Sequence, residues 1–280
     1  MTSPDRPAPA VIDPRGIEAI SRGREYALPG GPDAALLLHG LTGATFEMHH
    51  LASRLHGAGI RSLAPVMAGH GGDPRALVGL PWQDWVAQAV CDLDRLGPAR
   101  RTVLAGSSMG ALVACAVARA RPERVDGLVL LAPAMQLQPT GRLGALLGRI
   151  GLLRRWVVPK GSGSDVHDAD MRRRNPCLTG VPLAAVAELQ RLAAHVATIA
   201  PEVRVPALVV AGGQDHTVTL AGVRRLAGLL PGAGGEVLVL PESWHLVGVD
   251  VERERCGDAA LRFIEALPLR AAGGAGQAVG

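Results

Sequence analysis

The sequence is short of aromatic side chains and of clustered basic residues, and these shortages argue against a nucleic-acid-binding protein. Its 280 residues include four tryptophans, two phenylalanines and one tyrosine, so few rings are available to stack on bases. The net charge is only +4, and the basic residues are scattered along the chain apart from a small group at 172–174. A nucleic-acid-binding surface usually shows a basic stripe or patch. We therefore exclude nucleic acid as a partner.

Cysteines and long apolar runs are also scarce. Cys91, Cys115, Cys177 and Cys256 are far apart and form no CxxC pair, which argues against a zinc site and against a dense disulfide framework. We expect free thiols, and neither a metal nor an organic cofactor. No apolar run approaches the roughly 20 residues of a membrane span, and prolines and charges interrupt residues 1–16, where a secretory signal needs an apolar stretch. The sequence thus predicts a soluble, cytoplasmic protein without integral membrane association, and it leaves the oligomeric state open.

What the sequence does contain is a regular alternation of short apolar runs with longer segments of helical period. This alternation is typical of parallel strands joined by crossover helices, and strands buried on both faces are continuously apolar. The stretch 17–28 is more polar and is expected to add an antiparallel edge strand or hairpin. The fold class is therefore α/β, with a mostly parallel central sheet and helices on both faces. The expected strands are 34–40, 60–66, 101–107, 127–133, 207–213 and 236–242, and the expected helices are 45–57, 82–96, 109–120, 219–230 and 251–267.

One connection is much longer than a crossover helix requires. More than seventy residues separate the strands expected at 127–133 and 207–213. Residues 181–200 contain the ordinary crossover helix, so we interpret most of the remainder as an inserted helical cap or lid. The predicted organisation is a disordered tail at 1–14, one domain at 15–268 with the cap at about 136–185, and a disordered tail at 269–280.

The motif GSSMG at 106–110 provides a candidate nucleophile. It follows a strand and precedes a helix, and glycines on both sides relieve the crowding of a sharp strand-to-helix turn. In that frame Ser108 is the exposed tip, whereas a frame centred on Ser107 would need glycine at Ala105. The alternative is that both serines only cap the following helix. We predict Ser108 as the nucleophile.

A serine nucleophile needs a histidine base and a carboxylate that orients it, in the chain order serine, acid, histidine for such a turn. Asp215 follows the strand expected at 207–213, and His245 follows the last strand, so both occupy loops in the required order. His216 is a weaker candidate because it would face away from its neighbour. Asp250 is interpreted as a helix cap. The predicted triad is Ser108, Asp215 and His245.

The negative charge that forms on a substrate carbonyl must be met by hydrogen-bond donors. The N–H of Met109 lies directly after the nucleophile, at a helix N-terminus. A second N–H is expected from Leu41, in the loop after the strand at 34–40. His39, at that strand end, is expected to bond the backbone and hold the turn rather than act as a base.

Five motifs in order resemble those of the alpha/beta-hydrolase carboxylesterases, in particular the small bacterial carboxylesterase and monoacylglycerol lipase group. They are LLLHGLTGATFEMHHLASRLHGAGIRSLAPVMAGHG, LPWQDW, GSSMGA, VVAGGQDHTV and ESWHLVGVD, and the likeness covers residues 34 to about 265. The resemblance implies the same triad and the same two oxyanion donors. The chain departs from the family pattern at Ala111, where a second glycine is usual, and at Leu41, where an aromatic is frequent.

Together these features predict a serine esterase that cleaves small-molecule carboxylic esters with an apolar group. The inserted segment is rich in leucine, and Trp156, Leu146 and Val218 are the candidates for substrate contacts. A thioesterase or an acyltransferase with the same triad remains an alternative. A hydrolase fold that has become a non-catalytic binding module is the alternative from another class.

Overall fold

The computed structural model describes residues 16–17, 23–161 and 163–269, so the tails predicted at 1–14 and, except for residue 269, at 269–280 lie outside the described residues. Within that part of the chain a single seven-stranded sheet forms the centre of the fold, in the order β1-β3-β2-β4-β5-β8-β9. The strands are β1 (Tyr26–Leu28), β2 (Ala34–Leu38), β3 (Arg61–Ala64), β4 (Thr102–Ser107), β5 (Gly127–Leu131), β8 (Ala207–Gly212) and β9 (Leu238–Leu240). All six strands expected from the apolar runs are present.

The sheet is parallel from β3 to β9, and β1 pairs antiparallel with β3 at one edge. This confirms the edge strand expected within 17–28. The chain runs outward from β2 to β3 and then returns to the other side of β2 with β4, so the strand order reverses at this pair. Ligands of parallel α/β sheets bind at such a reversal, beyond the carboxyl ends of the strands.

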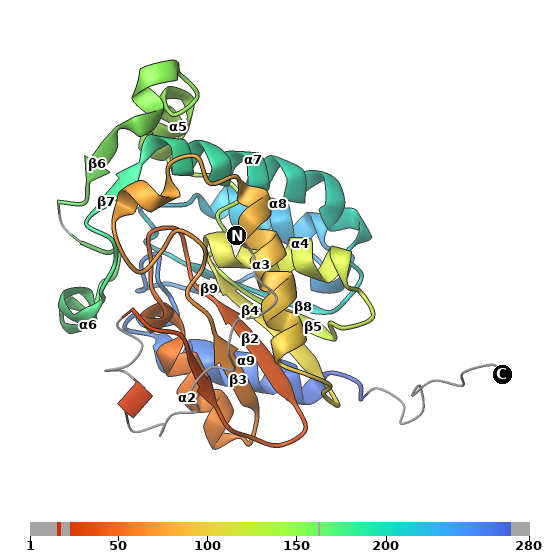
Figure 1. The fold of residues 1–280 in the computed structure, drawn as a ribbon. Coiled ribbons are helices and arrows are strands. Elements are labelled where there is room, and N and C mark those ends of the chain that lie inside the picture. The colour runs from red at the N-terminus through yellow and green to blue at the C-terminus, as the bar shows by residue number, and fades with distance from the viewer. Residues whose placement is uncertain (1–15, 18–22, 162, 270–280) are drawn as a thin grey trace.

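Helices cover both faces of the sheet (Figure 1). On one face lie α2 (His49–Gly57), which a 3-10 turn at Thr45–Met48 precedes, and α9 (Arg253–Ala266). On the other face lie α3 (Trp82–Arg95), α4 (Met109–Ala120), α7 (Leu183–Ile199) and α8 (Leu220–Leu229). The helix bounds differ from the expected ones by a few residues at most.

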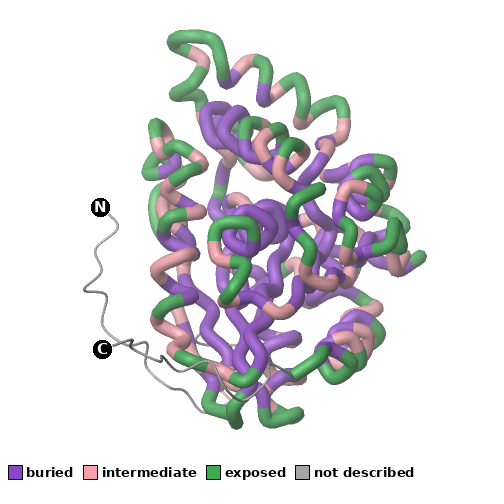
Figure 2. The backbone as a smooth tube through the Cα atoms, turned by 90° about the vertical axis from the view of Figure 1, so that its right-hand side faces the viewer, coloured by how far each residue is buried: buried purple, intermediate pink, exposed green. Residues whose placement is uncertain are grey.

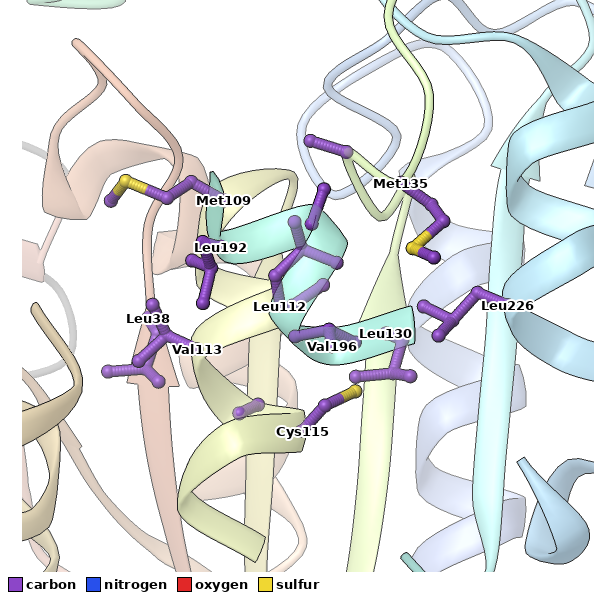
Figure 3. Close-up of a cluster of buried hydrophobic side chains, with 14 of the residues drawn as sticks. Leu38, Met109, Leu112, Val113, Cys115, Leu130, Met135, Leu192, Val196 and Leu226 are labelled. Atoms are coloured by element: carbon purple, nitrogen blue, oxygen red, sulfur yellow. The ribbon is translucent and has the colours of Figure 1, made fainter. Parts of the chain in front are cut away.

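The two faces of each strand belong to two separate cores, because successive strand side chains alternate in direction. Leu36, Leu104 and Leu130 pack under α4, whereas Leu37 and Val129 pack under α2 and α9. Figure 3 shows the α4 side, where side chains from β2, β5, α4, α7 and α8 meet around Leu112 and Leu130. The continuous apolar runs are therefore strands buried from both sides.

The long connection between β5 and β8 contains α7 and, before it, a set of short elements beyond the carboxyl ends of the strands (Figure 1). The strands β6 (Val157–Pro159) and β7 (Gly180–Pro182) pair antiparallel and form a separate two-stranded sheet. Residues 181–200 do contain the crossover helix, as expected. The short elements are α5 (Pro139–Leu147), a 3-10 turn at Gly151–Arg155, β6 (Val157–Pro159), α6 (Ala169–Arg174) and β7 (Gly180–Pro182). In the part of the chain that the structure describes, no helix is long and apolar enough to cross a membrane.

Candidate active site

Ser108 lies on a sharp turn between β4 and α4, with a backbone φ of 54° and ψ of −109°. A positive φ is uncommon for a residue with a side chain, so the surrounding structure must hold it. The Ser108 N–H donates to the Leu131 carbonyl at 2.8 Å, and its carbonyl accepts the Ala134 N–H at 3.2 Å. The turn is therefore anchored to β5 and to the loop that follows it.

Glycine is required on both sides of this turn by close packing. A Cβ on Gly106 would lie 2.2 Å from the Gly110 carbonyl oxygen, and a Cβ on Gly110 would lie 2.1 Å from the Leu38 carbonyl oxygen. These contacts bring the start of α4 against β4 and against the end of β2. The glycines thus permit the helix to begin directly above the sheet, with Ser108 at its first turn.

The structure brings the three residues predicted as a triad into one hydrogen-bonded chain. His245 Nε2 lies 2.9 Å from Ser108 Oγ, and His245 Nδ1 lies 2.8 Å from Asp215 Oδ2. The other carboxylate oxygen of Asp215 accepts the N–H groups of Thr217 and Val218 at 2.8 and 2.7 Å. This arrangement fixes the carboxylate, and the carboxylate in turn fixes the imidazole with Nε2 toward the serine.

The electrostatics of the site favour a proton on His245. Burial lowers the pKa of the imidazole, but the charge and hydrogen bond of Asp215, together with the charges of Asp165 and Glu47, outweigh burial and raise this pKa above its ordinary value. Such an imidazole accepts a proton from a serine more readily than a free histidine does. The three predicted residues are therefore in contact, with the imidazole between the hydroxyl and the carboxylate.

In the loop after β2, the residues on both sides of Leu41 donate backbone hydrogen bonds to buried or partly buried side chains. The Gly40 N–H donates to Glu47 Oε2 at 2.8 Å, and the Thr42 N–H donates to His70 Nε2 at 2.9 Å. A Cβ on Gly40 would lie 3.2 Å from the Ser108 Cβ, so this loop passes directly beside the serine. Met109 is the first residue of α4, where N–H groups have no partner within the helix. Both predicted oxyanion donors therefore flank Ser108.

His39, which is buried, and His70, which is partly buried, hold this loop through hydrogen bonds. The His39 Nδ1 bonds the Gly40 carbonyl at 2.9 Å and its Nε2 accepts the Met67 N–H at 3.0 Å. Burial lowers the pKa of His39 to about 3 and that of His70 to about 4. His39 therefore holds the turn, as expected, and does not contact the serine hydroxyl.

A cavity of about 280 Å³ opens beside Ser108 and His245. Its apolar walls come from the end of β2, from the loop after His245, and from the insertion with α7. Its polar lining includes the ammonium-bearing Lys160, the only lysine of the chain. The apolar side chains that line it are Leu41, Leu137, Val181, Val186, Leu189 and Leu246.

The three residues predicted to contact substrate are not part of this lining. Trp156 and Leu146 are 61% and 57% exposed on the outside of the insertion. Val218 is buried, and its backbone bonds Asp215 and pairs with Leu137. A leucine-rich composition could not tell the inner from the outer face of the insertion.

Three carboxylates near the site were not predicted to have a role there. Glu47 and Asp165 line the cavity, and Asp250 lies behind the histidine loop. Glu47 stands as an acid between the apolar Phe46 and Met48, which is a signal that sequence analysis could have used. Asp165 has no such signal, because only the path of the insertion brings it near His245.

Asp250 is not a helix cap, since α9 begins at Arg253. Its fully buried carboxylate accepts four N–H groups, from Trp244 and Val251 in its own loop and from His167 and Asp168 in the insertion, at 2.7 to 3.0 Å. Asp250 therefore joins the inserted segment to the loop that carries His245.

His216 also contacts the insertion rather than the serine. Its Nδ1 lies 2.9 Å from Asp165 Oδ1, and its ring meets the Trp244 ring edge-on at 4.7 Å. Within the described residues no three His, Cys, Asp or Glu side chains gather as a metal site would require.

This fold and this constellation define an α/β-hydrolase-fold serine hydrolase. A family model described as "Serine aminopeptidase, S33" matches residues 32–252, and the chain belongs to that family. The resemblance found in the sequence motifs is thereby confirmed for the fold and for the class of enzyme.

Two relatives that match over nearly their whole length are named as a lipase and a carboxylesterase. The chain is 25% identical over 245 residues to a thermostable monoacylglycerol lipase of Bacillus sp. (strain H-257), covering 87% of this chain and 95% of that protein. It is 23% identical over 246 residues to a carboxylesterase of Bacillus subtilis (strain 168), covering 87% and 97%.

Solved structures show the same fold. A metagenome-derived lipolytic enzyme superposes with a TM-score of 0.78 at 24% identity, covering 87% of this chain and 97% of that one. A monoacylglycerol lipase of Paleococcus ferrophilus superposes with a TM-score of 0.69 at 20% identity, covering 86% and 98%.

Proposed function

We propose that the protein hydrolyses carboxylic esters with an apolar acyl or alcohol group, and that Ser108, His245 and Asp215 are its catalytic triad. The observation that carries the proposal is the continuous chain of contacts from Ser108 Oγ through His245 to Asp215, at 2.9 and 2.8 Å, on the wall of a cavity. The names of the two Bacillus relatives support an ester as the substrate.

The reaction would proceed in two steps through an acyl-enzyme. His245 takes the Ser108 proton while Ser108 Oγ attacks the ester carbonyl carbon, and the resulting oxyanion accepts hydrogen bonds from the N–H groups of Leu41 and Met109. His245 then donates its proton to the departing alcohol oxygen. A water molecule, deprotonated by the same imidazole, attacks the acyl carbon and releases the acid and the serine. Asp215 stabilises the imidazolium in both steps.

The cavity supports a substrate with one apolar and one polar end. Leu137, Val186 and Leu189 provide an apolar wall for a hydrocarbon chain, and Lys160 and Thr217 provide polar groups at the lining. A cavity of about 280 Å³ is at the small end of the usual range for ligand sites, roughly 300–1,000 Å³. We therefore expect a preference for short or medium acyl chains.

The decisive test is hydrolysis of a series of p-nitrophenyl esters from acetyl to palmitoyl. Ser108→Ala should lower kcat by roughly 10⁴-fold or more, because the nucleophile is removed. Ser107→Ala removes the adjacent hydroxyl, which hydrogen-bonds Glu47, and it should cost far less activity than Ser108→Ala. A fully active Ser108→Ala enzyme, or a folded wild type that cleaves no ester of the series, would refute the proposal.

A cytoplasmic location is also part of the proposal, and its support comes from the sequence. Cys91, Cys115, Cys177 and Cys256 are free thiols in the structure, which is compatible with a reducing compartment. Cell fractionation followed by detection of the protein tests it directly. Recovery in the periplasmic or extracellular fraction would refute this part alone.

A further inference from the structure

Large exposed apolar side chains gather on one part of the molecule. Of those that the structure describes, all but two lie between residues 143 and 158, at the end of the insertion farthest from the sheet. This end is the upper part of Figure 2, where the tube is mostly exposed. The side chains are Leu143 (57% exposed), Leu146 (57%), Ile150 (51%), Leu152 (90%), Trp156 (61%) and Val158 (45%). A patch of this kind on a globular protein usually marks an interaction surface.

The same segment carries positive charge without any negative charge. Arg142, Arg149, Arg154 and Arg155 are exposed there, and no acidic residue occurs between Asp126 and Asp165. Within the described residues none of these four arginines has an ion pair. Elsewhere in the molecule, Arg54, Arg95 and Arg101 each pair with a carboxylate. The outer face of the insertion therefore combines exposed apolar side chains with arginines that have no ion pair among the described residues.

The inner side of the same segment reaches the cavity. Gly141 at the start of α5 and Lys160 after β6 both line it. A ligand that touches the outer face is thus close to the segment that borders the candidate active site. Arginines beside large apolar groups and an exposed tryptophan fit one partner well, the boundary between lipid head groups and hydrocarbon.

We propose that the exposed face of residues 142–158 docks the protein on an anionic lipid surface. The apolar side chains enter the head-group boundary, and the four arginines bind lipid phosphates. Docking would deliver esters dispersed in lipid to the cavity. This use rests on the proposed esterase function, whereas the docking itself does not.

Binding to vesicles tests the docking, with the full-length Ser108→Ala protein used so that no lipid is hydrolysed. It should float with vesicles of equal parts phosphatidylcholine and phosphatidylglycerol and bind phosphatidylcholine alone more weakly. Adding Arg149→Gln, Arg154→Gln and Arg155→Gln should weaken binding to the anionic vesicles by roughly a hundredfold, about fivefold per charge. Leu152→Ser should weaken binding to both kinds of vesicle.

Matched controls lie elsewhere on the surface. Arg224→Gln with Arg225→Gln removes two exposed arginines of α8, and Val251→Ser removes an apolar side chain that is 42% exposed. Neither should change vesicle binding. Absence of binding to anionic vesicles, or an equal loss in the controls, would overturn the proposal. A concentration-dependent dimer that Leu152→Ser abolishes, without vesicle binding, would assign the face to a second copy of the chain instead.

The esterase function is tested separately in the wild-type background. The arginine variants should hydrolyse soluble p-nitrophenyl acetate at the wild-type rate and lose activity only toward esters dispersed in anionic vesicles. Vesicle binding without any ester hydrolysis would leave the docking intact and refute the function. Ester hydrolysis without vesicle binding would support the function and refute the docking.

A different observation carries a second inference, about Glu47. Its carboxyl group is buried beneath the loop that carries Leu41, and one oxygen accepts the Gly40 N–H at 2.8 Å. A Cβ on Gly43 would lie 1.9 Å from the other oxygen, so the loop is shaped to leave room for this carboxyl. On the opposite side of Leu41, the Thr42 N–H is tied to His70.

We infer that Glu47 is a positioning residue that aims the Leu41 N–H at the reacting carbonyl. This role rests on the proposed esterase function. The bond to Glu47 holds the peptide before the one that carries the Leu41 N–H, and the bond to His70 holds the peptide after it. A donor that is fixed in advance stabilises the oxyanion most. Glu47→Leu removes the acceptor, whereas Glu47→Gln retains an oxygen at the same position.

The kinetics of these variants on p-nitrophenyl esters test the role. Glu47→Leu should lower kcat at least tenfold, toward the roughly 10²–10³-fold loss of one oxyanion donor, with little change in KM. Affinity for a boronic acid analogue of the tetrahedral intermediate should fall in parallel, and Glu47→Gln should restore most of both. If Glu47→Leu does not fold, Gly43→Ala is the substitute, because its added methyl group would displace the Glu47 carboxyl. It should lower kcat to a similar extent. Unchanged kcat in Glu47→Leu or in a folded Gly43→Ala, or a loss confined to KM, would overturn the inference; if Ser108→Ala is also fully active, the esterase function itself fails.

Discussion

The residues around Ser108 and the face of residues 142–158 lie at opposite extremes of the same molecule. Ser108 and His245 are 6% and 5% exposed, and each is tied to strands or to strand ends by several hydrogen bonds. Leu152 is 90% exposed. The positions of Ser108 and His245 are therefore fixed by the strands and the loops that follow them. The side chains on the outer face of the insertion pack against little else and are available for contact with a partner.

The two regions meet at a second set of contacts behind His245. Asp165 of the insertion accepts hydrogen bonds from His216 and Thr217, and its backbone carbonyl accepts the Leu246 N–H at 3.2 Å. Val166 packs against Leu246 in a small buried cluster. This part of the insertion is therefore joined to the histidine loop by hydrogen bonds and apolar packing, so the contrast lies within the insertion itself.

The strongest test of the contrast compares two carboxylates near His245, one from the sheet and one from the insertion. Asp215→Asn should lower kcat on p-nitrophenyl esters by roughly 10⁴-fold, because the amide cannot stabilise the imidazolium or its tautomer. Asp165→Asn removes a charge that acts on His245 without contact, so it should cost much less. Equal losses in the two variants would contradict the assignment of Asp215 as the orienting acid.

The junction between the two regions is tested by Asp250→Ala. Four partly buried hydrogen bonds would lose their acceptor, and since an unsatisfied buried donor costs about 1–3 kcal/mol, the free energy of unfolding should fall by about 3 kcal/mol or more. Urea denaturation measures this change. Glu123→Ala, at an exposed carboxylate, should leave the free energy nearly unchanged; a comparable change there would show that Asp250 has no special structural role.

The sequence predicted the sheet side well because its signals are local. Apolar runs mark strands buried on both faces, and the spacing of Gly106, Ser108 and Gly110 reflects contacts between adjacent backbones. The insertion lacks such signals. Trp156 and Leu146 were predicted to contact substrate from composition alone, but which face of a short helix turns inward depends on how the segment folds back on α7.

The pH dependence of kcat/KM provides a second comparison of Asp215 and Asp165. His245 must be neutral to act as a base, and its pKa is raised by nearby negative charges, so kcat/KM should fall as the pH drops through a midpoint above 6.5, the ordinary histidine value. Removing either charge lowers this pKa, so the midpoint should move to lower pH in Asp165→Asn and further in Asp215→Asn. A midpoint that neither variant moves would mean that another group controls the acid limb.

The smallest effect is expected on the outer face, and it separates stability from binding. Leu152→Ala should change the free energy of unfolding by less than about 0.5 kcal/mol, since its side chain is already in water. Leu192→Ala in α7 removes the same atoms from the core shown in Figure 3 and should cost about 2–5 kcal/mol. Thermal unfolding of both variants measures the difference. A large loss of free energy of unfolding in Leu152→Ala would mean that this leucine packs within the fold in solution. The face of residues 142–158 would then serve internal packing rather than contact with a lipid surface.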